Sequence, residues 1–549
     1  LEQQKRTSFG LPGIPKTKIE FSKDHLENVY NNFKEASKKL RHTPTWVGEL
    51  YLEFHRGTYT SIAKNKKNNR TSELLYQKAE TAGVFDRLLT GADYNRAIYY
   101  NGWRGIVTNQ FHDIIPGSSI FDVYEQCDID YKKIIDSGND AFEKSISSIA
   151  SNLQTEGGTF AYNPNSFAVS DVIENNGKYV YVKDVPAFGY SVCKPKEACS
   201  VKASKNKIES RNYIIKLDEF GNIVSLYDKM LETELASENG KLNELKLYED
   251  IPRQYDAWEI SSYYKEKAYD LTENVEVEPV NCGAAAGVKI TRRVFDSLIC
   301  QTILLYDDIR RIDIKTDIDW HEEHMLLKAH FPFNVHASKA TYDIQFGNVE
   351  RNNHENTSWD AAKFEVCAHK WADISEDGYG VSILNDCKYG YSCLGNVMTL
   401  SLLKCATNPN PEADKGKHSF TYSIYPHKGS FKDGGTVREA YKLNQKLVLR
   451  DIGKQDGALP EKHSMLSCDC GNIFIETVKL AEDDNSVIVR LYDAYNRKSS
   501  PTIEFNFDIK NAYIADMLEN PIEKTEVLGN RKIKLNVSNY EIVTLKLEV

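Results

Sequence analysis

Apolar residues recur at helical spacing in the first third of the chain. The apolar residues follow one another at intervals of four, four, four and three positions: Tyr99, Trp103, Val107, Phe111 and Ile114. This spacing is typical of a helix packed along one face. Pro116 ends this helix, because proline has no backbone N–H and disfavours the helical conformation of the preceding residue. The pattern predicts that His112 and Asp113 lie in the last helical turn, off the apolar stripe. A following helix is predicted to begin with Ser118 or Ser119 as its N-cap.

Two further helices are predicted around this one. A long polar helix covers about 61–89, and the helix that follows Ser119 reaches about residue 153. Short connections between the segments predict an up-and-down three-helix bundle as the middle domain at 46–155. The basic residues of the polar helix, interpreted as a solvated face, are Lys64, Lys66, Lys67 and Arg70.

The chain before the bundle has a different pattern. Residues 1–45 contain a turn-rich connector, an alternating run at 16–21 and a helix that Ser22 caps and that continues to Leu40. A single strand–helix unit cannot bury both of its faces. Residues 1–45 are therefore predicted to be the C-terminal remnant of an α/β domain whose remainder precedes Leu1.

From Gly158 onward, short alternating runs separated by turn residues replace the helical pattern. Residues 212–227 predict a β-hairpin with its turn at 218–222. Similar runs occur at 287–293, 300–305, 311–318, 341–346, 379–385, 397–403, 419–425, 473–479, 486–492, 502–507 and 532–546. They predict antiparallel sandwich structure, as a domain at 156–430 and a C-terminal β domain at 431–549. The predicted fold class is thus α+β and multidomain, with an α/β tail, a three-helix bundle and a large antiparallel β-sandwich region.

Composition narrows the class of partner. The net charge of −10 over 549 residues argues against a nucleic-acid partner and against electrostatic capture by acidic membranes. No apolar run approaches the ~20 residues that a membrane-spanning helix needs. Eleven scattered cysteines form neither a compact disulfide framework nor paired zinc spacings, so free thiols in a reducing, cytoplasmic compartment are expected.

Two groups of polar residues are candidates for a functional site. Carbonyl dipoles at a helix C-terminus favour a cation, so His112 with Asp113 could hold a proton or a metal ion; the alternative is a capping or surface pair. The segment 48–60 is unusually rich in charge for a structural loop and includes Arg56 and Tyr59. The alternative for this segment is a buried salt-bridge network.

Four blocks resemble one known family, and the resemblance covers nearly the whole chain. The stretch NQFHDIIPGSSI at 109–120 is similar to the histidine motif of glycoside hydrolase family 38, the zinc-dependent retaining α-mannosidases. The other similar blocks are GELYLEFHRGTYT at 48–60, the segment 341–392 that begins TYDIQFGNVERNN, and ADKGKHSFTYSIYPHKG at 413–429. The last two resemble the cytosolic and bacterial branch of the family. The sequence departs from the family pattern at Asn352 and Asn353, where relatives usually carry Pro-Thr.

The resemblance implies roles for particular residues. His112 would ligate zinc and Asp113 would contact the sugar. Arg56 and Tyr59 would be further sugar contacts. Retaining glycosidases use two carboxylates about 5–5.5 Å apart. The resemblance implies that both, with the remaining zinc ligands, lie in an α/β barrel before Leu1, so that this chain alone is expected to be inactive.

The function implied by the resemblance is hydrolysis of terminal, non-reducing α-D-mannose residues from oligosaccharides with zinc as cofactor. The expected partner is a mannose-containing oligosaccharide, and homo-oligomerisation is left open. The alternative is a non-catalytic carbohydrate-binding or scaffold β-sandwich protein. If His112 is a zinc ligand, it should lie on an open surface near Asp113. Arg56, Tyr59 and the strand end at 386–389 should face the same, largely apolar, surface.

Overall fold

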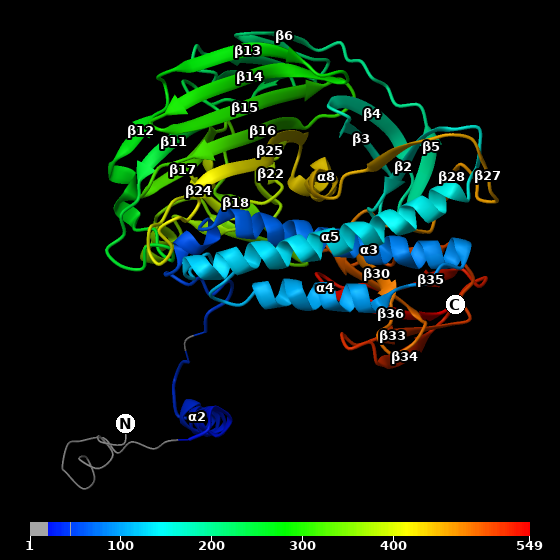
Figure 1. The fold of residues 1–549 in the computed structure, drawn as a ribbon. Coiled ribbons are helices and arrows are strands. Elements are labelled where there is room, and N and C mark those ends of the chain that lie inside the picture. Colours follow the sequence, from blue (N-terminus) through cyan, green and yellow to red (C-terminus); the bar gives the residue numbers. More distant parts are fainter. Residues whose placement is uncertain (1–19, 44) are drawn as a thin grey trace. The chain divides into compact units, whose positions relative to one another are not determined.

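The computed structural model describes residues 20–43 and 45–549, which fall into two compact units. The first unit ends at Leu52, and the second is Glu53–Val549. The second unit contains the helical bundle and the strands described below (Figure 1).

The first unit contains helix α2 (Ser22–Ser37). Phe21, rather than the predicted Ser22, occupies its N-cap position, and the helix ends before Leu40. None of its residues is buried, so the apolar side chains of Leu26, Tyr30 and Phe33 are exposed. The strand predicted at 16–21 lies mostly outside the described residues, and the α/β remnant stays a prediction.

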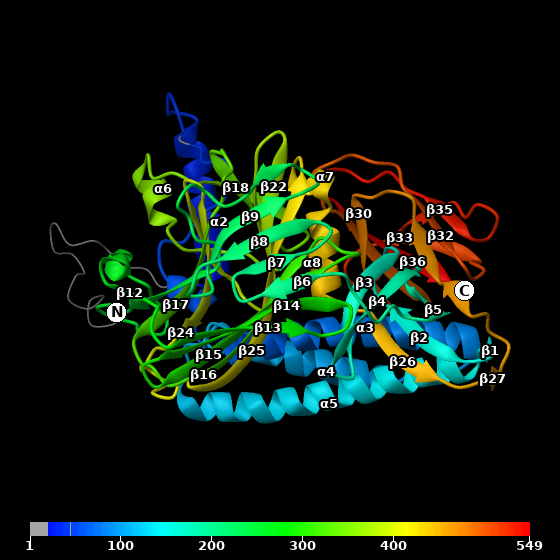
Figure 2. The same cartoon turned by 90° about the horizontal axis from the view of Figure 1, so that it is seen from above.

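The predicted three-helix bundle is present in the second unit. Its helices, which lie side by side in both views (Figure 1, Figure 2), are α3 (Ala63–Thr90), α4 (Arg96–Asn109) and α5 (Phe121–Ser151). The buried ring of Tyr76 on α3 lies 5.9 Å from that of Trp103 on α4, and its hydroxyl donates to the Ile134 carbonyl of α5 at 3.0 Å. Gly102 permits this approach, since a Cβ there would lie 1.8 Å from the Tyr76 ring.

The apolar stripe predicted along α4 is only partly correct. Tyr99 is buried, but Val107 and Phe111 are 62% and 54% exposed, and Ile106 is buried instead. Each step of four residues overshoots the helical period of about 3.6, so the stripe turns away from the core by about 40° per step. The helix also ends at Asn109, earlier than the stripe predicts.

The basic side of α3 is only partly the solvated face that the sequence predicts, since Lys64 is exposed and Lys67 half-buried. Lys66 and Arg70 are only 5% and 4% exposed. The Arg70 guanidinium donates to the side-chain oxygen of Asn385 at 2.9 Å and to the Tyr389 hydroxyl at 3.1 Å. The prediction failed because these partners lie more than 300 positions away in the chain.

The β region consists of antiparallel strand pairings among the described residues, as the sequence predicts. A long sheet has the order β13 (Val275–Asn281), β14 (Ala285–Val294), β15 (Ser297–Tyr306), β16 (Ile312–Trp320), β25 (Gly416–Lys428), β22 (Tyr379–Asn385), β21 (Trp371–Ser375), β18 (Lys339–Ile344), β19 (Gly347–Asn352). A second sheet has the order β12 (Ala268–Asp270), β11 (Glu244–Glu249), β17 (Met325–Pro332), β24 (Val397–Lys404), β23 (Gly390–Leu394), β20 (Val366–Cys367). A third has the order β10 (Thr233–Glu234), β9 (Ile223–Asp228), β8 (Tyr213–Leu217), β7 (Lys207–Glu209), β6 (Lys202–Ser204).

The predicted hairpin is confirmed by β8 and β9, whose pairing places Tyr213 opposite Asp228. Its turn is closed by the Asp218 carboxylate, which accepts the N–H groups of Phe220 at 3.0 Å and Asn222 at 2.8 Å. Short helical segments elsewhere in the unit are η1 (Arg56–Tyr59), η2 (Ser262–Glu266), α6 (Ser358–Ala362), α7 (Phe431–Gly434) and α8 (Thr436–Asn444).

The C-terminal part of the chain contributes to more than one sheet. One C-terminal sheet has the order β30 (Ile473–Leu480), β31 (Val487–Asp493), β36 (Ile542–Glu548), β33 (Asn511–Ala515), β34 (Pro521–Thr525), and another the order β29 (Leu466–Cys468), β32 (Thr502–Phe505), β35 (Lys532–Lys534). The remaining pairings join β26 (Val448–Ile452), β2 (Gly158–Asn163), β5 (Gly189–Cys193) and β28 (Lys462–Ser464) in that order, β3 (Val169–Asn175) with β4 (Lys178–Val185), and β1 (Gln154–Thr155) with β27 (Gln455–Asp456). The sheet β26-β2-β5-β28 therefore crosses the domain boundary predicted at 430–431, which stays a prediction.

The three helices of the bundle lie between two groups of strands. Figure 1 shows the strands around β16 and β25 on one side of α3 and α5, and β30 with the other C-terminal strands on the opposite side. One hydrophobic core joins the bundle to the C-terminal strands and includes Tyr76, Ile146, Val478 and Leu545. The bundle therefore shares its core with the C-terminal sandwich.

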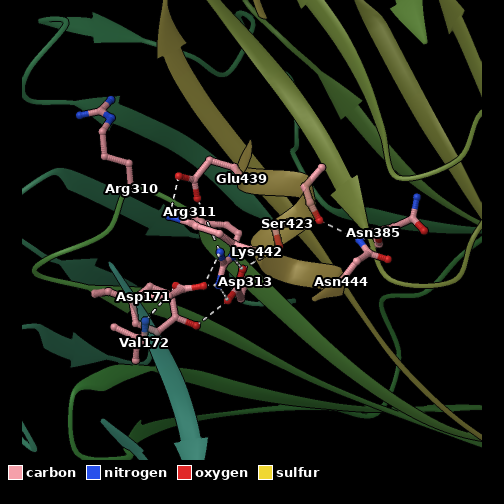
Figure 3. A network of polar contacts seen from close by, with 12 residues as sticks. Asp171, Val172, Arg310, Arg311, Asp313, Asn385, Ser423, Glu439, Lys442 and Asn444 are labelled. Carbon is pink, nitrogen blue, oxygen red and sulfur yellow. Dashed lines mark hydrogen bonds and ion pairs between the residues drawn. The ribbon is translucent and has the colours of Figure 1, made fainter. Parts of the chain in front are cut away.

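A buried ion network ties three distant elements together (Figure 3). The Arg311 side chain, just before β16, is 3% exposed and lies 3.3 Å from the Asp171 carboxylate on β3. It also lies 2.7 Å from the carboxylate of Asp313 and 3.6 Å from that of Glu439 on α8. The hydroxyl of Ser423 on β25 donates to Asp313 at 2.6 Å. The network fixes β3 and α8 against the long sheet.

Candidate functional site

His112 and Asp113 lie in a series of turns between α4 and α5. The N–H groups of Ile114 and Ile115 donate to the Phe111 carbonyl at 2.8 and 3.1 Å. The prediction that His112 and Asp113 belong to the last helical turn is therefore wrong, because hydrogen bonds of successive turns replace the helical ladder after Asn109.

The predicted serine cap of the following helix is also wrong. Ile120 occupies the N-cap position of α5 and no side chain caps it. The hydroxyls of Ser118 and Ser119 instead donate to the backbone carbonyl of Asp113, at 3.3 and 2.6 Å. These bonds hold the backbone of Asp113 and leave its carboxylate uninvolved.

The side chains of His112 and Asp113 are directed toward solvent. They are 78% and 48% exposed, with 3.4 Å between Nε2 of His112 and Oδ2 of Asp113. The ring of Phe111 lies 4.2 Å from the imidazole, centre to centre. Val107 and Phe111 add exposed apolar surface nearby in sequence. The exposure expected of His112 is thus present, while its role as a ligand stays a prediction.

The loop that carries His112 is anchored to the beginning of α3. The Lys66 ammonium donates to the carbonyls of Ile115 at 3.0 Å and Pro116 at 3.1 Å, and burial lowers the pKa of Lys66 to about 7. Asn65 donates to the Ile114 carbonyl at 3.0 Å. Gly117 has a φ of 87°, and a Cβ there would lie 2.3 Å from the carbonyl oxygen of Ser61. Side chains of α3 thus hold the loop in place by hydrogen bonds to the backbone carbonyls of the loop.

Arg56 is largely buried and already has partners within the protein, and its role as a sugar contact stays a prediction. It is 8% exposed, and its Nη2 and Nε atoms donate to the Ala362 carbonyl at 2.9 and 3.2 Å. Its guanidinium also lies 3.4 Å from the Glu259 carboxylate and 4.5 Å from the centre of the Phe364 ring. The alternative of a buried salt-bridge network describes Arg56 correctly, and Tyr59 on the same short helix is half-buried.

The strand end at 386–389 is likewise occupied by contacts within the protein. Lys388 is 4% exposed, its ammonium donates to the Leu402 carbonyl at 2.6 Å, and it lies 3.8 Å from the Phe420 ring centre. The Tyr389 ring lies 4.2 Å from the Arg70 guanidinium. These residues join β strands to α3, and their polarity in the sequence reflects that contact.

The residues that support the loop could not be recognised from the sequence. The sequence predicts Lys66 on a solvated face of its helix. Asp414 stands out only as part of the block 413–429 that resembles the family, with no predicted role. The Asp414 carboxylate nevertheless accepts the N–H groups of Ile62 and Ala63 at 2.7 and 2.6 Å, and burial raises its pKa. It thereby caps α3 at the end where the His112 loop packs. No local signal marks such a cap, since it lies about 350 positions from the helix it serves.

The donors at His112 do not make a zinc site by themselves. Catalytic zinc is held by about three protein ligands. Within residues 20–43 and 45–549, no group of three or more His, Cys, Asp and Glu side chains has the arrangement to hold a metal ion. One exposed imidazole and one neighbouring carboxylate are suitable donors for zinc, but further donors would have to complete the set.

Two predictions from composition can be compared with the structure, namely that no helix spans a membrane and that the cysteines are free thiols. None of the helices in the described segments has both the length and the apolar character of a membrane span. The chain's eleven cysteines all fall among the described residues, and none of them forms a disulfide there.

Three protein-family models match segments that together make up most of the second unit. The matched descriptions are "Alpha mannosidase middle domain" at 53–149, "Glycosyl hydrolases family 38 C-terminal domain" at 208–412 and "Glycosyl hydrolases family 38 C-terminal beta sandwich domain" at 472–545. Alpha-mannosidase 2C1 of Homo sapiens is 31% identical over 100% of this chain and 54% of its own length. Alpha-mannosidase G of Dictyostelium discoideum is 31% identical over 97% of this chain and 55% of its own length. The chain spans about half the length of these relatives.

A solved structure shares the fold. The crystal structure of an alpha-mannosidase from Enterococcus faecalis V583 aligns with a TM-score of 0.79. The alignment covers 94% of this chain and 72% of that chain, at 16% sequence identity. The agreement extends over the bundle and the β region together.

Proposed function

Because the chain belongs to glycoside hydrolase family 38, we propose that its protein hydrolyses terminal, non-reducing α-D-mannose residues of oligosaccharides. The observation that carries the proposal is the 31% identity to an α-mannosidase over the entire chain. Matching family descriptions for the middle and C-terminal domains support it. The partner of the site is accordingly a mannose-containing oligosaccharide.

The contribution of this chain would be one zinc ligand and one sugar contact. His112 would donate its imidazole to a zinc ion whose other ligands lie outside the described residues. Such an ion, when bound, supplies Lewis-acid polarisation and orients the hydroxyls of the sugar. The carboxylate of Asp113 would accept hydrogen bonds from those hydroxyls, which a charged acceptor binds more strongly than a neutral one.

The geometry suits this division of roles. The serine hydroxyls and Lys66 hold the loop through its backbone carbonyls. The side chains of His112 and Asp113 are thereby left exposed on a fixed backbone. A rigid support of this kind limits the entropy that a ligand has to remove on binding.

The retaining mechanism needs two further carboxylates in the roles of nucleophile and acid/base. We propose that neither comes from this chain and that the chain alone does not turn over substrate. For the complete protein we propose the cytosol as its compartment. The eleven cysteines, none of them in a disulfide among the described residues, support this, because thiols stay reduced there.

The test is the effect of Asp113→Asn on the complete enzyme. The substitution should lower kcat/KM for an aryl α-mannoside by about 100-fold, the typical effect of losing a contact that strengthens in the transition state. The thermal midpoint should stay within about a degree, because no buried contact is removed. Asp140→Asn, at an exposed position of α5, is the matched control and should leave both quantities unchanged.

Two readouts separate the parts of the proposal. Nuclear magnetic resonance of the first product should show α-mannose, as retention requires, and removal of zinc by a chelator should abolish turnover reversibly. An unchanged rate in Asp113→Asn, or a loss of stability as large as the loss of rate, would show that Asp113 has no sugar contact.

A further inference from the structure

A cavity with aromatic and charged walls lies between the helical bundle and the C-terminal sheet. It measures about 320 Å³ and lies among α3, α4, β30 and β31. Its aromatic lining comes from one segment, namely Tyr94, Tyr99, Tyr100 and Trp103. The opposite wall contributes Lys479 and Arg490. Tyr100, 56% exposed, places the margin of the cavity at the protein surface.

A buried carboxyl group lies in this cavity. Glu80 is 5% exposed and accepts hydrogen bonds from Nε1 of Trp103 at 2.9 Å and from the Tyr94 hydroxyl at 3.4 Å. Burial raises the pKa of Glu80 to about 7. The cavity thus combines aromatic rings with a carboxyl group that is held by a ring N–H.

A second cavity of about 250 Å³ shares Gln77 and Trp103 with the first. It lies among α3, β18, α8 and β30, and its carboxylates are those of Glu73, Asp343 and Glu476. Glu73, Gln77 and Glu80 follow at intervals of four and three, which places them along one face of α3. The two cavities are therefore neighbours along the same helix face, on either side of Trp103.

The second cavity contains polar groups without hydrogen-bond partners. The imidazole of His369 makes no hydrogen bond within the described ranges, although it packs edge-on against Tyr389. Burial, followed by the charges of Arg70 and Lys370, lowers the pKa of His369 to about 3, so the ring is neutral. The Lys370 ammonium lies 4.9 Å from the Tyr441 ring centre, and no described carboxylate lies within ion-pair distance of it. Both groups line the cavity and are free to bind a ligand.

The chemistry of the lining selects an uncharged, hydroxyl-rich ligand. Carboxylates, Lys370 and a neutral imidazole can together donate to and accept from hydroxyl groups, and cations and anions are mixed rather than segregated. Aromatic rings offer apolar faces for C–H groups. A metal ion is not favoured, because no cluster of three metal-ligating side chains occurs in the described residues. Sugar rings combine hydroxyl edges with C–H faces.

We propose that the cavities on either side of Trp103 form an accessory binding site for a mannose-containing oligosaccharide, one sugar unit in each. The choice of mannose rests on the proposed function; the class of ligand rests on the lining. The second cavity adjoins the His112 loop through Gln110, whose amide donates to the Glu73 carboxylate at 2.7 Å. Sugar binding at this site does not require His112.

The experiment is calorimetric titration of this chain with α-linked mannotriose. Tyr100→Ala in the first cavity and Lys370→Met in the second should each weaken binding about tenfold or more, since each removes a sugar contact. The controls are Tyr255→Ala and Lys133→Met, which alter exposed residues of the same types outside the cavities and should leave the affinity unchanged. His112→Ala should also leave it unchanged.

The outcomes distinguish this site from the proposed hydrolysis. No binding of mannotriose by the unaltered chain at millimolar sugar overturns the accessory site. Binding that survives both Tyr100→Ala and Lys370→Met also overturns it. Loss in His112→Ala alone would place the sugar at the loop, which overturns the accessory site but leaves the proposed function standing. Circular dichroism of each variant guards against unfolding, and a variant that unfolds is replaced by Glu80→Gln, which preserves the side-chain volume.

Discussion

The carboxyl group of Glu80 makes stability depend on pH in an unusual direction. Its pKa is about 7 in the folded protein and about 4.5 in an unfolded chain, so the folded state keeps a proton that the unfolded state releases between these values. Stability is therefore expected to fall as the pH rises from 4.5 to 7, through this one group.

Glu80→Gln should remove that dependence. At pH 8 the variant should be more stable than the unaltered chain by about 3 kcal/mol, because the cost of ionising a buried carboxyl is gone. At pH 4 the two should be equal, since glutamine resembles the protonated acid. Urea unfolding at pH 4, 6 and 8 measures the difference, with Glu125→Gln on exposed α5 as control. A constant difference at all three values would contradict the assignment of the proton to Glu80.

The exposed imidazole of His112 leads to a prediction about zinc. Titration of this chain with zinc should show binding no tighter than micromolar at His112, because one imidazole and one carboxylate do not replace the water around the ion. Calorimetry of the unaltered chain and of His112→Ala measures it. A 1:1 site of nanomolar affinity that disappears in His112→Ala would mean that the chain itself completes the ligand set.

At the level of elements, helix α3 depends on a residue from a distant part of the chain. The Asp414 carboxylate accepts hydrogen bonds from two N–H groups at the beginning of α3, and Asp414 is 6% exposed. Asp414→Asn should cost about 1–2 kcal/mol, because an amide oxygen accepts only part of this pair and carries no charge for the helix dipole. Thermal unfolding should report the loss, and hydrogen exchange should quicken at Ile62 to Lys66. Asp377→Asn, at an exposed turn position, is the control and should have no effect.

Local patterns predict the long helices and fail where distant partners decide the structure. The predicted ranges 61–89 and 119–153 lie close to α3 and α5. The end of α4 is not predicted correctly, because turns closed by backbone bonds leave no apolar signature. The sequence offers the burial of Arg56 only as an alternative, because nothing local identifies its carboxylate partner Glu259, which lies 203 positions away. The motif around His112 locates an exposed pair, but its sequence does not show which other residues would complete a zinc site.

On the scale of the whole molecule, removal of the Arg311 charge should lower the free energy of unfolding strongly. Arg311→Met would leave the carboxylates of Asp171, Asp313 and Glu439 buried without their cation. The free energy of unfolding should fall by about 3–5 kcal/mol. Urea unfolding measures it, and Arg531→Met is the control, since that side chain is half-exposed and its ion pair contributes under about 1 kcal/mol. A loss no larger than that of the control would show that the network is not a structural tie.

The cap of α3 has a consequence for synthesis on the ribosome. The carboxylate that closes its first turn is made 352 residues after Ile62, and at about 5–20 residues per second the helix waits roughly 20–70 seconds for it. Strand β2 is likewise synthesised long before its partner β26, since Gly158 pairs with Ile452. Nascent chains halted before Asp414 should therefore show an α3 that protease cuts readily, and chains halted beyond residue 549 by a linker should resist. Until Asp414 and the C-terminal strands emerge, the apolar faces of the nascent helices stay uncovered, and exposed hydrophobic surface of this kind is what chaperones bind.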